Sequence, residues 1–153
     1  MTATKTSSSV LIEASPSAVW NRVGSIENMG TFSPETMTTE WLDGATEARQ
    51  GARFRGHNHN GHYQWTVDCE VLEYTPEKRF QFGVGSSEDG FNAIWTYELE
   101  ARGDATVLTE SVDAPVLLDP ESTPGKNPHR LEELNGLIKA TLAYVKTDTE
   151  GKS

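Results

Sequence analysis

Alternating apolar and polar positions run through most of the chain and predict a series of β-strands. Branched or aromatic residues recur at every second position, and turn sequences such as Asp43-Gly44 and Gly103-Asp104 separate the runs. The pattern predicts seven strands, over residues 7–14, 36–42, 51–59, 62–74, 78–85, 91–101 and 105–113. Strands joined by such short turns favour a single antiparallel sheet.

Apolar residues spaced three and four positions apart, as in a helix, occur near both ends of the chain. Ser15 and Pro16 are typical of the cap and the first position of a helix. Short helices are therefore expected after the first strand, ending before Pro34 because the residue preceding a proline avoids helical geometry. A long helix is predicted from about residue 128 to 146, after a connection over 115–128. Its apolar stripe consists of Leu131, Leu134, Ile138, Leu142 and Val145.

The dipeptide Asn60-Gly61 predicts a tight hairpin, since both central positions of the favoured two-residue turn need positive φ. A turn of two residues would place His59 opposite His62 and Arg55 opposite Thr66. The charged residues of both strands would then share the solvent face. The opposite, core face would collect Phe54, Tyr63, Trp65, Val67, Cys69 and Val71, and alternation likewise turns Phe80, Phe82, Val84, Trp95, Tyr97 and Leu99 inward.

Composition narrows the classes of function. The chain has 153 residues, a formal net charge of −10 and one cysteine, and we expect one domain over 1–153 with an ordered core at about 7–146. Basic residues do not cluster, which argues against nucleic-acid binding. No apolar run reaches the roughly 20 residues needed to span a bilayer, and no signal peptide is recognisable. We therefore expect a cytoplasmic monomer or homodimer that does not insert into membranes.

Glu110 is the acidic residue best placed to act in catalysis or ligand binding. If Leu108 and Val112 point inward, Glu110 on the same strand does too, and an apolar environment would raise its pKa. It could then act as an acid or a base. Alternatively, a bulge could turn Glu110 to solvent, or it could pair with an arginine of a neighbouring strand.

Two other sets of residues, three histidines and a cysteine, give weaker indications of a functional site. His57, His59 and His62 could meet on one face of the hairpin and hold zinc, but that face is the solvent face, so we expect a polar surface and no metal. Cys69 is expected inside as an inert apolar residue. The sequence contains no recognisable catalytic triad, phosphate-binding glycine loop or paired catalytic carboxylates.

Several segments resemble the polyketide cyclase/dehydrase-like proteins of the START-related SRPBCC superfamily. The order of elements, a strand, two short helices, six strands and a long helix, is that of the α+β helix-grip fold, in which a curved seven-stranded antiparallel sheet wraps a long C-terminal helix. The resemblance covers nearly the whole chain. It rests on residues 10–16 with Val19 and Trp20, 33–35, 51–58, Trp65, 95–99 and 109–111.

The resemblance implies an elongated cavity between sheet and helix that holds lipids, polyketides or sterol-like molecules. We expect no cofactor. We expect it to be lined by Phe54, Trp65, Phe82, Trp95, Tyr97, Glu110 and Ile138. The leading hypothesis is binding of an apolar small molecule, with Tyr97 and Glu110 as polar anchors. A second is an aromatase/cyclase-type enzyme in which Glu110, Tyr97 or Tyr63 moves protons. A third, a protein-interaction domain, predicts a filled interior and a wide exposed apolar patch.

Overall fold

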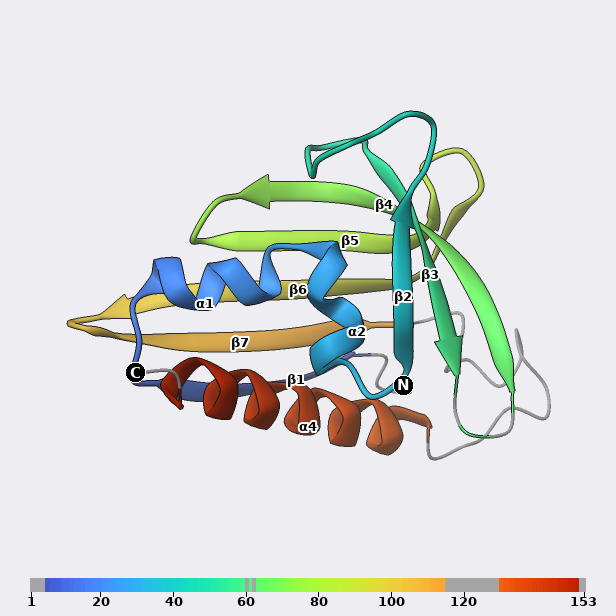
Figure 1. Ribbon diagram of the computed structural model, residues 1–153. Coiled ribbons are helices and arrows are strands. Elements are labelled where there is room, and N and C mark those ends of the chain that lie inside the picture. The colour runs from blue at the N-terminus through green and yellow to red at the C-terminus, as the bar shows by residue number, and fades with distance from the viewer. Residues whose placement is uncertain (1–4, 60, 62, 115–129, 152–153) are drawn as a thin grey trace.

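A curved antiparallel sheet encloses one side of the long C-terminal helix in the computed structural model, which describes residues 5–59, 61, 63–114 and 130–151 (Figure 1). The strands are β1 (Lys5–Ile12), β2 (Thr36–Trp41), β3 (Arg53–His59), β4 (Gln64–Thr75), β5 (Arg79–Ser86), β6 (Gly90–Arg102) and β7 (Ala105–Asp113). The helices are α1 (Pro16–Val23), the 3-10 turn η1 (Ile26–Asn28), α2 (Met29–Phe32) and α4 (Arg130–Glu150). The predicted helix-grip architecture is confirmed.

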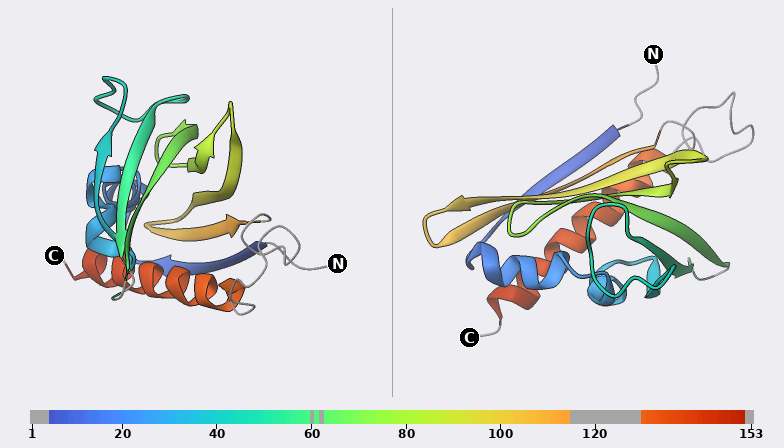
Figure 2. Two further views of the ribbon diagram at one scale, coloured as in Figure 1. Left: turned by 90° about the vertical axis from the view of Figure 1, so that its right-hand side faces the viewer. Right: turned by 90° about the horizontal axis from the view of Figure 1, so that it is seen from above.

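The order of strands in the sheet is β1-β7-β6-β5-β4-β3-β2, and every neighbouring pair is antiparallel. The sheet curls so that α1, α2 and α4 all lie on its concave side, with α4 running along β1 (Figure 2). Two layers therefore face each other, and the space between them forms the interior. None of the described helices combines the length and apolar character needed to cross a membrane.

The elements extend past the expected core of 7–146 at both ends. Near the start of the chain, the Asn135 amide donates to the Thr6 hydroxyl at 2.8 Å. Near its end, Thr149 is buried and the Glu150 carboxylate accepts from the backbone N–H of Glu13 at 2.7 Å. These contacts give the end residues partners in the fold. The predicted connection over 115–128 lies outside the described residues.

The hairpin between β3 and β4 differs from the predicted one. His59 pairs with Gln64 and Arg55 with Asp68, so four residues connect the strands where two were expected. This register brings the Arg55 guanidinium to 2.7 Å from Asp68, an ion pair that the predicted register would not form. A shift of two residues keeps every side chain on its face. Tyr63, however, falls in the connection and is 72% exposed, so its predicted inward position was wrong.

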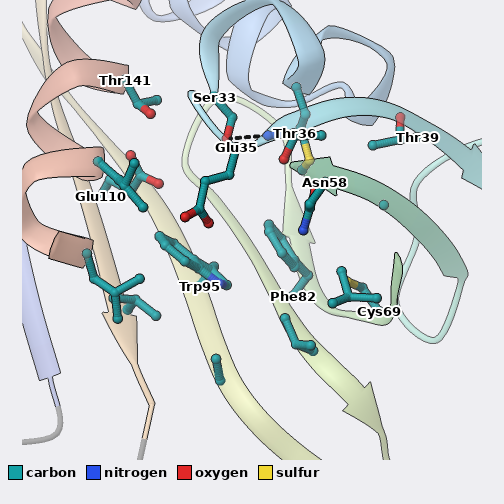
Figure 3. Close-up of a pocket in the computed structure, with 18 of the residues that line it drawn as sticks. Ser33, Glu35, Thr36, Thr39, Asn58, Cys69, Phe82, Trp95, Glu110 and Thr141 are labelled. Atoms are coloured by element: carbon teal, nitrogen blue, oxygen red, sulfur yellow. Dashed lines mark hydrogen bonds between the residues drawn. The ribbon is translucent and has the colours of Figure 1, made fainter. Parts of the chain in front are cut away.

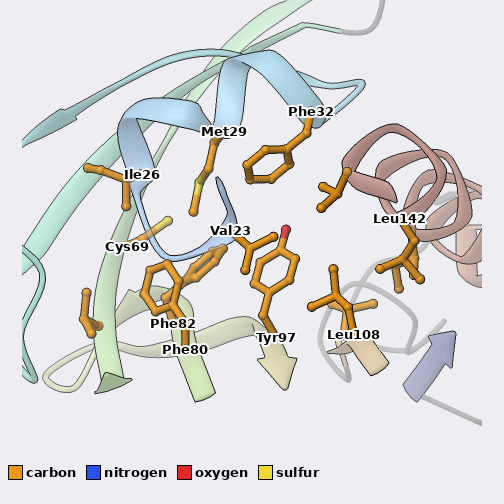
Figure 4. Packing of buried hydrophobic residues seen from close by; sticks show 14 of the residues in the cluster. Val23, Ile26, Met29, Phe32, Cys69, Phe80, Phe82, Tyr97, Leu108 and Leu142 are labelled. Carbon is orange, nitrogen blue, oxygen red and sulfur yellow. The ribbon is translucent and has the colours of Figure 1, made fainter. Parts of the chain in front are cut away.

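Buried apolar residues from the concave face and the helices form one cluster (Figure 4). The Phe82 ring meets Phe54 edge-on and Phe80 at a tilt, with ring centroids 5.3 and 5.5 Å apart. On α4 the predicted stripe is buried at Leu134, Ile138, Leu142 and Val145, and Leu131 at its start is half-buried. Burial of this stripe holds the helix against the sheet.

The start of α1 follows the predicted capping pattern. The Ser15 hydroxyl accepts from the backbone N–H of Ala18 at 3.2 Å, and Pro16 occupies the first turn. At its other end, the Tyr74 hydroxyl donates to the Gly24 carbonyl at 2.8 Å, while the Tyr74 ring packs on Trp20 at 5.2 Å. Tyr74 thus ties the end of α1 to β4.

Replacing Tyr74 by Phe is expected to lower the free energy of unfolding by about 1 kcal/mol, because the Gly24 carbonyl loses its donor while the ring contact with Trp20 stays. Urea denaturation followed by circular dichroism measures this. Tyr144→Phe, at an exposed tyrosine on α4, is the control and should change stability by less than about 0.5 kcal/mol. Equal losses in the two variants would contradict the role given to Tyr74.

Candidate functional site

A cavity of about 160 Å³ lies between the concave face of the sheet and the helices α2 and α4 (Figure 3). Its walls are mainly apolar. Aromatic side chains from four strands line it, namely Phe54, Trp65, Phe82, Trp95 and Tyr97. Phe54, Phe82 and Tyr97 are buried, whereas Trp65 and Trp95 are partly exposed and mark the side that reaches solvent. The cavity is therefore an aromatic pocket with an open side.

Six of the seven residues expected in the cavity line it: these five aromatics and Glu110. Ile138 does not, although it is fully buried. Because α4 lies along β1, one side of its apolar stripe packs within the core, and the neighbouring side, with Leu134, Leu137 and Thr141, faces the cavity. The prediction for Ile138 was wrong in this respect.

Glu110 and Tyr97 are two neighbouring polar residues of the cavity wall. They lie directly opposite each other on β7 and β6, and their exposed fractions are only 3% and 4%. The Tyr97 hydroxyl lies near enough to the Glu110 carboxyl to affect its pKa. Oε1 of Glu110 is buried and has no hydrogen-bond partner in the protein. The inward orientation expected from alternation is correct, and neither a bulge nor an arginine pair intervenes.

Burial changes the acid–base behaviour of both residues. Loss of water raises the pKa of Glu110 from 4.5 to about 8, and the hydrogen bond from Tyr97 opposes only part of that rise. Burial first, and the nearby Glu110 second, raise the pKa of Tyr97 well above its usual 10. At neutral pH both groups therefore carry a proton, and the Glu110 carboxyl is a hydrogen-bond donor inside an apolar space.

Several polar residues on the cavity wall were not recognised from the sequence, among them Asn58 and Glu35. Asn58 lines the cavity, and its buried Oδ1 has no partner. The inward position of Asn58 was predictable, because it lies two residues after Gly56 and four after Phe54 on β3 and alternate residues of a strand point to the same face. Glu35 also lines the cavity, and Figure 3 shows its carboxylate directed inward near Trp95. Glu35 precedes β2, where alternation gives no orientation.

Cys69 lies on the cavity wall, as its parity predicted. Burial raises the pKa of its thiol to about 12, so the reactive thiolate is scarce at neutral pH.

On the outer face of the sheet, His57 Nε2 lies 3.1 Å from the Glu40 carboxylate. His62 lies outside the described residues. Within the described ranges, no group of three or more His, Cys, Asp or Glu side chains is arranged to hold a metal.

A second, wider cleft of about 430 Å³ lies between α1, α2 and α4. Its walls are largely polar, and the Arg22 guanidinium pairs across it with Asp148 at 2.9 Å. Such walls do not favour an apolar ligand. The hypothesis of a protein-interaction domain predicted a filled interior, and the cavity between sheet and α4 does not agree with that expectation.

The sequence matches, over residues 3–149, the model of a family described as polyketide cyclase / dehydrase and lipid transport. A search of curated proteins found no match to the sequence.

Solved structures with a similar fold include a polyketide-cyclase-like protein of Corynebacterium glutamicum, 24% identical, with a TM-score of 0.67 over 99% of this chain and 96% of that one. Protein MLL2253 of Mesorhizobium loti has 12% identity and a TM-score of 0.71, covering 97% and 98% of the two chains. The di-domain ARO/CYC protein StfQ of the steffimycin biosynthetic pathway has 10% identity and a TM-score of 0.72. The match covers 97% of this chain and 51% of StfQ. At these identities the likeness shows the fold.

Proposed function

Because this chain belongs to the polyketide cyclase / dehydrase and lipid transport family, we propose that it binds an apolar small molecule, such as a polyketide or a lipid, in the cavity between the sheet and α4. The observation that carries this proposal is a mostly apolar, aromatic-walled cavity containing two buried polar atoms without partners, Glu110 Oε1 and Asn58 Oδ1. Ligand sites typically combine such walls with a few polar groups that fix orientation.

The size of the cavity limits how the ligand fits. An apolar cavity of about 150 Å³ holds benzene. At about 160 Å³, this cavity encloses one ring or a short chain segment. A larger ligand would extend past Trp65 and Trp95 toward solvent, where their partly exposed rings offer additional contact area. The buried part of the ligand would then lie against Phe82 and Tyr97.

A second candidate function is a cyclase-type enzyme that uses the same cavity. Two groups that carry protons at neutral pH, Glu110 and Tyr97, meet on its wall, which is the minimum that acid–base assistance to a folded polyketide chain requires. Tyr63, the third residue considered for this role, is exposed in the connection between β3 and β4. Binding needs only the cavity and its walls, so it remains the first proposal.

Titration with the neutral fluorescent probe N-phenyl-1-naphthylamine tests the proposed function. Probe emission should rise on entering the apolar cavity and saturate at one equivalent. At a free probe concentration 100 times its dissociation constant, the protein should be stabilised by about 2.7 kcal/mol. Emission that rises without saturation, together with an unchanged melting temperature, would contradict the proposal.

A further inference from the structure

The carboxyl of Glu110 projects from β7, a strand that is paired on both sides. Its strand position faces Tyr97 on β6 and Ser8 on β1, both within hydrogen-bonded ladders. The Tyr97 hydroxyl lies near the carboxyl, while the buried Oε1 of Glu110 has no hydrogen-bond partner in the protein. An unpartnered polar atom in such surroundings is unfavourable unless something else completes its hydrogen bonding. The cavity is the space from which a partner can come.

The charges around the cavity define which partner is suitable. The described lining residues include no lysine, arginine or histidine, and they include a second carboxyl, Glu35. The titratable groups that face Glu110 from neighbouring elements are Tyr97 on β6 and Glu35 before β2, whereas Ser8 on β1 and Thr141 on α4 are uncharged. A ligand carboxylate placed here would lose its water without meeting a counter-charge.

We propose that Glu110 determines ligand specificity by donating a hydrogen bond into the cavity, so that the site selects uncharged ring compounds carrying an acceptor such as a ketone oxygen. The proposal rests on the function proposed above and adds the chemical class of the ligand. A neutral acceptor needs only the hydrogen that the protonated carboxyl already carries.

An amine would be the opposite kind of ligand for this carboxyl. To bind, an ammonium group would have to leave water and force Glu110 to ionise in the same apolar space. A buried ion pair recovers little more than the desolvation of its two charges. The three N–H donors of the ammonium would also need acceptors, and apart from Glu110 itself the described wall has one buried acceptor without a partner, Asn58 Oδ1. The wall around Glu110 therefore favours a neutral ketone.

Four compounds that share one ring system separate these possibilities: tetralin, 1-tetralone, 1-aminotetralin and tetralin-1-carboxylate. Isothermal titration at pH 6, where Glu110 is protonated, should show 1-tetralone binding about five- to tenfold more tightly than tetralin. The ammonium and carboxylate compounds should both bind more weakly than 1-tetralone. At pH 9.5, where Glu110 has lost its proton, the preference for 1-tetralone should fall below about twofold.

Variants at Glu110 link the preference to this side chain, and the ratio of the two affinities is the readout in each variant. Glu110→Gln retains an N–H donor, so its preference for 1-tetralone should persist and become independent of pH. Glu110→Leu should remove the preference. Glu88→Gln, at an exposed glutamate in the turn between β5 and β6, is the control and should leave the ratio unchanged.

The outcomes separate this proposal from the proposed function. Equal affinities of the wild-type protein for 1-tetralone and tetralin, or tightest binding of the amine or the carboxylate, would overturn the specificity given to Glu110 while leaving cavity binding intact. Failure of all four compounds to bind would overturn both.

Discussion

Replacing Glu110 by Gln is expected to stabilise the protein relative to wild type by an amount that increases with pH, reaching about 3 kcal/mol more at pH 7 than at pH 4. The physical cause is the pKa of about 8 that burial gives this carboxyl in the folded protein, against 4.5 in the unfolded chain. Glutamine preserves the shape of the side chain, but it has no proton to lose.

The sign follows from which state holds the proton. Below pH 4.5 both the folded and the unfolded protein keep Glu110 protonated. Between pH 4.5 and 8 the unfolded chain releases the proton while the folded protein retains it, so stability falls as pH rises through this window. Above pH 8 the carboxyl ionises in both states, and the loss is complete. The variant lacks this loss and therefore gains relative to wild type across the window.

Urea denaturation at pH 4, 5.5, 7 and 8.5 measures this difference, with Glu88→Gln as the control for removing one exposed carboxyl. The pKa of Asp68, Glu70 and Glu150 is lowered by their hydrogen-bond partners, but these groups are present in all three proteins and cancel in the comparison. If wild type and Glu110→Gln differ in stability by the same amount at every pH, the burial assigned to Glu110 is incorrect.

Replacing Gly56 by Leu is expected to weaken binding of N-phenyl-1-naphthylamine at least tenfold while the protein stays folded. Gly56 is buried on β3 and lines the cavity. A Cβ there would lie 3.5 Å from Val67 Cγ2 and 3.6 Å from Asn58 Oδ1, which are ordinary contact distances. The rest of the leucine side chain would then occupy space that the ligand needs.

Circular dichroism and thermal melting separate a filled cavity from a damaged fold in this variant. We expect a stability within about 1 kcal/mol of wild type, because the added side chain buries apolar surface and removes the extra conformational freedom of glycine. Gly136→Leu adds the same side chain on α4, where an added Cβ would meet nothing within 4 Å beyond the helix's own backbone and the neighbouring residues, and should leave probe affinity unchanged. Full affinity in folded Gly56→Leu would mean that the probe binds elsewhere.

Alternation along the strands predicted the strands and which of their side chains point inward, whereas the curvature of the sheet and the cavity were implied by the family resemblance. Because neighbouring side chains on a strand point to opposite faces, the inward positions of Phe82, Trp95, Tyr97 and Glu110 followed from sequence. The same argument would have placed Asn58 inside. Alternation gives the face on which a residue lies but not the residue opposite it on the next strand, so it could not indicate that Tyr97 and Glu110 would lie directly opposite each other.

Other features depend on geometry that local patterns do not contain. The length of the connection after β3 was misjudged because Asn60-Gly61 favours a tight turn, whereas the register that forms pairs Arg55 with Asp68. Helical periodicity identified the buried stripe of α4 but not which of its edges faces the cavity. That edge, with Thr141 and without Ile138, is determined by how α4 lies against β1.

The most direct test of ligand binding in this cavity uses the four tryptophans as internal reporters. Trp65 and Trp95 line the cavity, whereas Trp20 packs on Tyr74 and Trp41 donates to Glu27 outside it. In ¹⁵N-labelled protein, saturating N-phenyl-1-naphthylamine should shift the indole N–H signals of Trp65 and Trp95 and leave those of Trp20 and Trp41 nearly unchanged. Shifts confined to Trp20 and Trp41, or no shifts under saturating conditions, would contradict a ligand site between the sheet and α4.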